Sequence, residues 1–320
     1  MTRLLRRSFA WLLLIGAGIA VVGVAAVYLA PDKVLDAELA RKHWQAGVTE
    51  KHVEVDGQHW RYLERGPADG DVVVLLHGLQ ADSSTWLDVL RHAPDHRRYL
   101  IPDLPGFGGS PTPVDRDFRA ASQAERVHAW LRALDVERID LAGHSMGGFI
   151  AGRFAAAHPS EVRSIGFVDA AGVPFDSNDF LRTLERGENP YKVTTRAQFD
   201  RFLDKVFKHR PFLPGPVRDV YADRVIPRAD DWNVAMEALK APDQRYGLVG
   251  LLPTLDMPSL VLWCREDQVL DVSSVKVFEA GLPNERVVLL DDCGHMPVME
   301  RPRDTADALA ALWRSVYAAN

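Results

Sequence analysis

The chain has 320 residues, of which 47% are hydrophobic and 26% are charged, and its formal net charge at pH 7 is -6. These are the proportions of a soluble globular protein, and the modest negative charge excludes the broad basic surface that nucleic-acid binding needs. The presence of only Cys264 and Cys293 excludes a disulfide scaffold, and no Cys/His spacing typical of a zinc site is present. We expect the two cysteines to be half-buried thiols, with a single bond between them as the alternative.

The first segment along the chain is apolar. Residues 9–29 form 21 consecutive positions without a charge, and a helix of that length, at about 1.5 Å per residue, matches a hydrocarbon core of about 30 Å. A cleavable secretory signal is the alternative, but the apolar run continues to Leu29, and Pro31 argues against cleavage after Ala30. We predict a basic tail over residues 1–8 and a retained transmembrane anchor over residues 9–30.

Charges beside this segment predict its orientation. Arginines at positions 3, 6 and 7 precede it, so the positive-inside rule places the N-terminus in the cytoplasm and the remaining chain in the periplasm of a bacterial inner membrane. Three basic residues between positions 33 and 42 oppose that orientation. Gly16 and Ala20 have the spacing that lets two spans pack closely, which makes the anchor a candidate homodimer contact. Residues 31–50 are expected to form a juxtamembrane helix or linker.

The chain then alternates between strand and helix patterns over residues 51–172. "HVEV" and "HWRYLERG" flank Asp56-Gly57, which is typical of a hairpin. "DVVVLLHG", "RRYLIPDLPGFGGS" and "ERIDLAGHS" are buried strands that each end in a turn, and a helical pattern covers residues 120–134. This order predicts an α/β protein with a mostly parallel central sheet flanked by helices.

A Gly-x-Ser-x-Gly motif lies in "LAGHSMGG", residues 141–148. It follows a predicted strand and opens a helical segment that stops before Pro159. A serine on such a turn is held outward, Gly143 and Gly147 leave room for the tight backbone, and the helix N-terminus favours an oxyanion. Ser145 is therefore the predicted nucleophile.

A serine nucleophile needs a base that titrates near neutral pH, and histidine is the natural choice. His295 is the predicted base, because it lies in a glycine turn after a buried strand, in "ERVVLLDDCGHMPVMERP". His144 is interpreted as the variable residue of the motif, beside the serine, and no role is predicted for it. Asp267, at the end of the preceding strand, is the predicted acid that orients the base. Asp169, at the end of "VRSIGFVDAAG", is the alternative.

The order Ser145, Asp267, His295 resembles that of the α/β hydrolases. "LLHGLQADSSTW" is similar to the oxyanion loop of that family, and the resemblance covers residues 51–172 and 255–318. "WCREDQVLDVSS" and "CGHMPVMERPRDTAD", together with the apolar N-terminus, resemble membrane-bound monoacylglycerol lipases and bacterial membrane-anchored esterases and phospholipases A. The resemblance implies an α/β-hydrolase fold, a Ser-His-Asp triad, and an oxyanion hole made by the backbone N–H groups of Leu79 and Met146.

Residues 173–250 interrupt the alternation of strands and helices and are rich in aromatic side chains. In the fold that the resemblance implies, such an insertion forms a helical cap over the active site. The core is expected to continue over residues 251–320. His77 and Gly78 are predicted to contact substrate. Phe199, Phe202 and Phe207 are predicted to line an apolar tunnel for an acyl chain; the alternative is that they form only the core of the cap.

These patterns predict a membrane-anchored serine carboxylic-ester hydrolase that acts on lipid esters through an acyl-enzyme, with no cofactor and no metal. Its expected substrates are monoacylglycerols, lysophospholipids or phospholipids. A carbon–carbon bond hydrolase or a small-ester esterase of the same fold is the alternative, followed by a catalytically silent binding protein.

Overall fold

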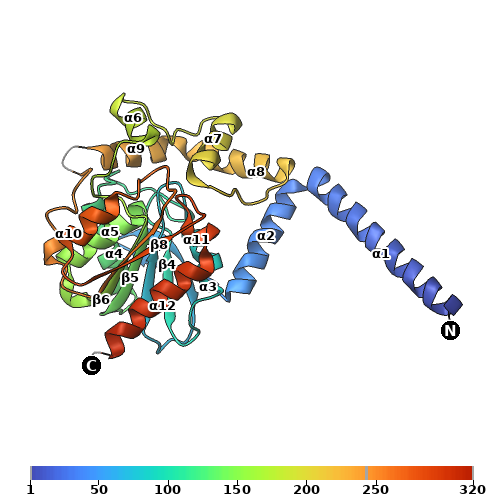
Figure 1. Ribbon diagram of the computed structural model, residues 1–320, viewed down its shortest axis with the longest axis horizontal. Coiled ribbons are helices and arrows are strands. Elements are labelled where there is room, and N and C mark those ends of the chain that lie inside the picture. Colours follow the sequence, from blue (N-terminus) through green and yellow to red (C-terminus); the bar gives the residue numbers. More distant parts are fainter. Residues whose placement is uncertain (1, 242–243, 319–320) are drawn as a thin grey trace.

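The computed structural model describes residues 2–241 and 244–318 and contains one sheet of eight strands (Figure 1). The strand order across the sheet is β1-β2-β4-β3-β5-β6-β7-β8. In chain order the strands are β1 Thr49–Val55, β2 Gln58–Arg65, β3 Val72–Leu76, β4 Arg98–Pro102, β5 Ile139–His144, β6 Val162–Val168, β7 Ser259–Cys264 and β8 Glu285–Leu290.

The sheet is mostly parallel. β1 and β2 pair antiparallel across the predicted hairpin turn, where both Asp56 and Gly57 have positive φ, and β2 pairs antiparallel with β4. All other neighbouring strands run parallel, and every residue of β5 and β7 is buried. The predicted α/β class and the mostly parallel sheet are confirmed. Parallel strands place their carboxyl ends at one edge, where the functional loops gather.

Helices cover both faces of the sheet. One hydrophobic cluster packs α4, α5 and α10 against one face, and a second cluster packs α3 and α12 against the other. Trp130 of α4 stacks on Trp60 at 6.0 Å, and Trp313 of α12 meets Tyr99 at 5.9 Å. The bounds of these five helices are α3 Leu87–Leu90, α4 Ala120–Ala133, α5 Met146–Ala157, α10 Ser274–Gly281 and α12 Pro302–Ala318.

Four further helices lie between β6 and β7 and spread across one end of the core (Figure 1). They are α6 Asp179–Glu185, α7 Arg196–Val206, α8 Gly215–Val225 and α9 Ala229–Lys240. The short helix α11, Pro297–Glu300, follows β8. α6 to α9 fall within the insertion predicted over residues 173–250. The predicted domain boundaries themselves stay predictions.

Two helices precede the sheet, α1 Thr2–Leu29 and α2 Pro31–Ala46. α1 projects away from the core, whereas α2 lies against α8, with Arg224 of α8 paired to Asp36 at 2.7 Å (Figure 1). Among the described residues no single helix has the length and hydropathy of a membrane span. Residues 16–29 and 31–46 meet that requirement only as a pair bent by 111°. The side chain of Ala20, in the predicted dimer contact, lies outside the described residues.

Cys264 and Cys293 form a disulfide bond, so the expectation of two free thiols is wrong. Cys264 ends β7 opposite Leu290 of β8, and Cys293 follows three residues later, which brings the two Cα atoms to 5.5 Å. Their separation of 29 positions along the chain hides this proximity in the sequence. It arises because β7 and β8 are neighbouring parallel strands.

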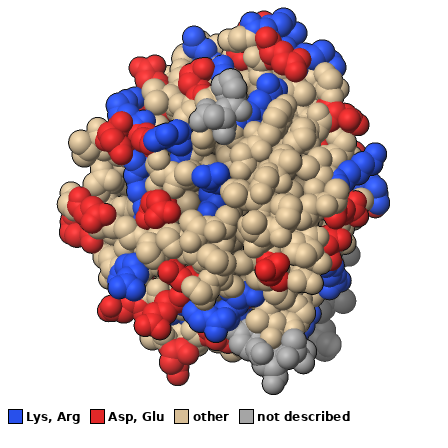
Figure 2. Space-filling model, turned by 90° about the vertical axis from the view of Figure 1, so that its left-hand side faces the viewer, with Lys and Arg blue, Asp and Glu red and all other residues tan. Residues whose placement is uncertain are grey.

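On the face shown in Figure 2, charged side chains lie around the rim and over one half, and a broad, nearly uncharged area occupies much of the rest. Acidic and basic groups alternate around this face, and neither sign gathers in a broad patch. The pattern agrees with the small net charge of the chain. A face of this kind offers no extended electrostatic surface for a polyanion.

Candidate active site

Ser145 occupies a sharp turn between β5 and α5. Its backbone has φ 54 and ψ -119, a strained conformation for a residue with a side chain. The turn is held by Ser145 N–H, which donates to Val168 O at 3.0 Å, and by Ala171 N–H, which donates to Ser145 O at 3.0 Å. The hydroxyl is therefore fixed at the carboxyl edge of the sheet, at the N-terminus of α5.

The two motif glycines are required by close backbone contacts. A Cβ added at Gly143 would lie 2.2 Å from the Gly147 carbonyl, and one added at Gly147 would lie 2.4 Å from Leu76 O. Both distances are shorter than real Cβ contacts. The first turn of α5 can pack against β3 and β5 only because these side chains are missing.

Three buried side chains from separate loops form a hydrogen-bonded chain. Ser145 Oγ lies 3.0 Å from His295 Nε2, and His295 Nδ1 lies 2.7 Å from Asp267 Oδ2. The second oxygen of Asp267 accepts the backbone N–H groups of Val269 at 2.7 Å and Leu270 at 3.1 Å. This arrangement fixes the imidazole with one nitrogen toward the hydroxyl and the other toward the carboxylate.

The alternative acid, Asp169, lies outside this chain. Its side chain is fully buried, and its Oδ1 accepts the backbone N–H of Cys264 at 3.0 Å. Its Oδ2 has no hydrogen-bond partner within the described parts of the chain. Burial, reinforced by the nearby charge of Asp267, raises the pKa of Asp169 well above its usual range. A neutral carboxyl bonded to backbone is poorly suited to stabilise an imidazolium.

His144 contributes a contact that the sequence reading missed. Its Nε2 lies 2.7 Å from the carbonyl oxygen of His295, so an N–H there donates to the backbone of the predicted base. Burial, together with the proximity of His295, lowers the pKa of His144 to about 3, which keeps its ring neutral. The variable position of the motif thus supports the histidine loop, a role that only the approach of two loops 151 residues apart reveals.

The predicted oxyanion donors flank Ser145. Leu79 and Met146 line a cavity with the serine, and their backbone N–H groups donate to no acceptor among the described residues. His77 lines neither cavity at the serine. Its Nε2 accepts the Leu104 N–H at 3.0 Å and its Nδ1 lies 2.8 Å from Gly78 O, while burial lowers its pKa. His77 therefore orders the loop that carries Leu79.

Ser145 lies at the junction of two cavities. The larger, of about 620 Å³, is bounded by α2, the Leu79 loop, His295 and the cap helices α7 and α8. Its lining includes Gly78 and the three phenylalanines singled out in the sequence, Phe199, Phe202 and Phe207. The smaller cavity, of about 80 Å³, lies toward α6 and α9 and is largely apolar, with Lys240 and Arg245 in its wall.

This architecture matches a known family over most of the chain. The model of the alpha/beta hydrolase family covers residues 73–308. The chain belongs to the α/β hydrolase family. The resemblance drawn from the sequence is thereby confirmed, and the parallel sheet and the serine turn of this α/β hydrolase have a common origin with those of the family.

Individual relatives of this α/β hydrolase are lipases. It is 29% identical to monoacylglycerol lipase ABHD6 from Bos taurus, covering 85% of this chain and 84% of the relative. It is 30% identical to lipase 1 from Psychrobacter immobilis, covering 82% of this chain and 83% of the relative. A solved structure, the crystal structure of a membrane phospholipase A described as a bacterial virulence factor, superimposes with a TM-score of 0.86. Its sequence is 35% identical to this chain, and the match covers 98% of this chain and 99% of that one. The protein is a lipase-like α/β hydrolase.

Proposed function

We propose that this α/β hydrolase is a membrane-anchored serine hydrolase that cleaves carboxylic esters of lipids. The observation that carries the proposal is the hydrogen-bonded chain of Ser145, His295 and Asp267 opening on an apolar cavity of about 620 Å³. A cavity of that size suits a ligand the size of an acyl chain. The three lipase relatives support the same chemistry.

The proposed mechanism begins with proton transfer. His295 Nε2 takes the proton of Ser145 Oγ as the oxygen attacks the ester carbonyl, and Asp267 stabilises the imidazolium through Nδ1–H. The tetrahedral oxyanion accepts the unpaired N–H groups of Leu79 and Met146. His295 then protonates the departing alcohol. Water, activated by the same histidine, releases the fatty acid from the serine ester.

The shape of the site supports a lipid substrate. The larger cavity reaches from Ser145 past aromatic side chains of α7 to α2, whose Val34 and Leu39 form part of its wall. An acyl chain lying there would bury its methylene groups, each contributing about 0.8 kcal/mol. α2 follows directly on the apolar helix α1. An ester drawn from a bilayer would enter from that side.

Four observations support a membrane anchor with the catalytic domain on the oxidising side. The N-terminal segment is apolar and bent, the crystal structure described as a membrane phospholipase A aligns over nearly the whole chain, and basic residues precede the apolar stretch. The Cys264–Cys293 disulfide favours the periplasm over the reducing cytoplasm. A homodimer through Gly16 and Ala20 of the anchor stays a prediction.

The experiment that tests this function measures hydrolysis by the full-length protein in detergent. The substrates are p-nitrophenyl esters of rising chain length, monoacylglycerols, lysophospholipids and diacyl phospholipids, and Ser145→Ala is the control. We expect activity to rise with acyl length on lipid esters and to disappear in the variant. Activity confined to short soluble esters would replace the lipid proposal by a small-ester esterase. Inactivity of the wild-type protein on every ester would favour the carbon–carbon hydrolase or the silent binding protein.

A further inference from the structure

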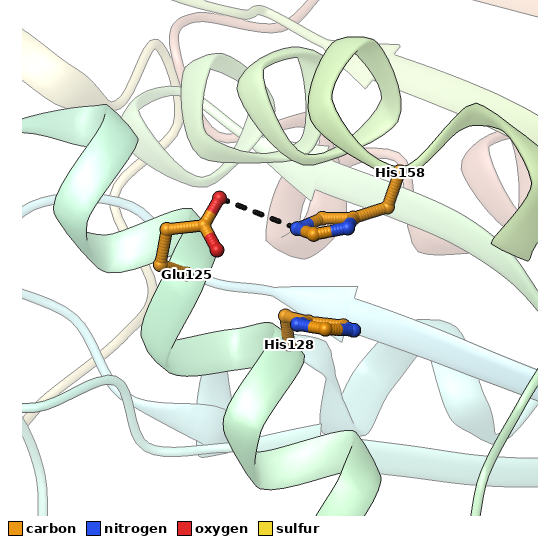
Figure 3. A group of neighbouring side chains, drawn as sticks. All are labelled: Glu125, His128 and His158. Carbon is orange, nitrogen blue, oxygen red and sulfur yellow. Dashed lines mark hydrogen bonds and ion pairs between the residues drawn. The ribbon is translucent and has the colours of Figure 1, made fainter.

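Metal-ligating side chains converge on the surface where α4 packs beside the end of α5, away from the residues that line the catalytic cavities (Figure 3). Glu125 and His128 are three residues apart on α4. His158 directly follows α5, and Glu161 is three residues further on, in the turn Pro159–Glu161. Residues three apart share one face of a helix, which places Glu125 and His128 side by side on α4. The turn after α5 brings His158 to Glu125 and Glu161 to His128, so two pairs of potential ligands face each other across the junction.

The ligand atoms lie within reach of one ion. One such atom from each of Glu125, His128 and His158 lies within 4.8 Å of the other two. The two imidazole rings stack with centroids 3.9 Å apart, and Figure 3 shows the Glu125 carboxylate beside them. His158 Nε2 lies 3.2 Å from Glu125 Oε1. A tilt of the two rings toward the carboxylate would bring all three groups to zinc-ligand distances of about 2 Å.

The surroundings favour a cation. Two carboxylate groups and two imidazole rings face this point, and the carbonyl end of α5 adds negative potential. His128 and His158 are each less than one-third exposed, and both rings pack against Phe154, which limits the positions they can take. An ion at this point would keep contact with water, so it would not bear the cost of a buried charge.

We propose that Glu125, His128 and His158 form a binding site for a zinc ion, with water in the fourth position and Glu161 orienting the histidines. Two imidazoles and one carboxylate are a ligand set that Zn²⁺ accepts. His128 Nε2–H would donate to Glu161 Oε1, which lies 3.1 Å away, leaving Nδ1 for the metal. His158 would bind through Nε2, its proton moving to Nδ1, which lies 4.0 Å from Glu161 Oε1.

The ion would tie α4 to the C-terminal end of the helix that begins at Ser145. It touches no group of the hydrogen-bonded triad, so we expect zinc to raise the unfolding temperature without changing kcat on a soluble ester. This consequence does not depend on the proposed lipid substrate.

The test is calorimetric titration of zinc into the full-length protein in detergent, after treatment with a chelator. We expect one ion per chain. His128→Ala and His158→Ala are each expected to weaken binding more than tenfold, and Glu161→Gln about tenfold, the effect typical of a residue that orients a ligand. Glu125→Gln replaces a largely exposed carboxylate, so this variant keeps the fold and isolates the loss of one ligand.

A second histidine pair provides the matched control. His52 and His59 also stack, at 4.8 Å, and each contacts a glutamate, but no group of three ligand atoms from described residues converges there. His59→Ala should bind zinc as the wild type does, and zinc should raise the unfolding temperature of His59→Ala but not of His158→Ala. Absence of zinc binding in the wild type, or undiminished binding in both Glu125→Gln and His158→Ala, would overturn the proposal.

Discussion

At the residue scale, two buried aspartates at the ends of neighbouring strands have different partners. Asp267 contacts His295, whereas Asp169 bonds to the backbone of Cys264 and is held neutral by burial. We expect Asp267→Asn to lower kcat by about 10⁴-fold, because an amide favours the wrong imidazole tautomer. Asp169→Asn should lower kcat less than tenfold, since it replaces one neutral group by another. Steady-state kinetics on one ester would check both variants, and equal losses in two folded variants would contradict the assignment.

His144 makes stability depend on pH. Its pKa is lowered to about 3 in the folded protein, below the ordinary value of 6.5, so the unfolded chain binds more protons between these limits. Stability is therefore fully present above pH 6.5 and falls as the pH drops toward 3, by at most about 1.4 kcal/mol per pH unit for this group.

His144→Gln keeps an N–H donor for the His295 carbonyl and removes the titration. Denaturant unfolding measured from pH 7 to pH 4 should show a shallower loss of stability in this variant than in the wild type. His77, whose pKa is also lowered by burial, titrates in both proteins and cancels in the comparison. Parallel curves for the two proteins would show that His144 binds its proton equally in the folded and unfolded states, and would contradict the lowered pKa.

Arg245 lines the smaller cavity beside Ser145, and its buried Nη2 has no hydrogen-bond partner among the residues that the structure describes. Such a donor suits an anionic group on the alcohol side of the ester. We expect Arg245→Gln to lower kcat/KM for a lysophospholipid about tenfold, and to leave a monoacylglycerol of equal acyl length nearly unchanged. Arg186→Gln, which removes an exposed charge that lines neither cavity, is the control. Equal losses on both lipids would contradict this role.

At the scale of elements, the disulfide joins the two loops that carry the acid and the base. Cys264, the last residue of β7, precedes Asp267 by three residues, and Cys293, beyond the end of the β7–β8 ladder, precedes His295 by two. Closing a loop of this length stabilises a folded chain by about 3 to 4 kcal/mol in the chain-entropy account. The bond also restrains the distance between the two loops.

We expect the double variant Cys264→Ala, Cys293→Ala to lose about 3 to 4 kcal/mol of its free energy of unfolding. Its kcat should fall with little change in KM, because the distance between Asp267 and His295 is less restrained while the cavities that bind substrate are retained. Denaturant unfolding and ester hydrolysis on the same preparation would measure both effects. A variant with wild-type kcat and reduced stability would leave the bond a purely structural role.

At the scale of the whole molecule, the oxidation state of the disulfide in the cell indicates the compartment in which the catalytic domain lies. Both cysteines are fully buried, so alkylation must follow denaturation. In bacterial cells quenched with acid, the denatured full-length protein should react with a polyethylene-glycol maleimide only after reduction, as a periplasmic domain would. Labelling of both cysteines without reduction would place the catalytic domain on the reducing side and contradict the proposed topology.

Local patterns were sufficient to predict much of the molecule. The Asp56-Gly57 turn, the buried strands, and the serine turn between strand and helix are each encoded within about ten consecutive residues, so their positions could be read directly. The order of Ser145, Asp267 and His295 along the chain identified the family, because each lies at the end of a predicted parallel strand.

Only the tertiary structure decided which of these residues meet. The contact of Asp267 rather than Asp169 with His295, the bond between the two cysteines, and the support of His295 by His144 depend on strand order and register. The same holds for the cavity wall contributed by α2, which lies far from the cap in sequence. Sequence periodicity determines elements through local backbone and burial preferences, whereas these contacts join segments whose separation along the chain carries no information about their distance in space.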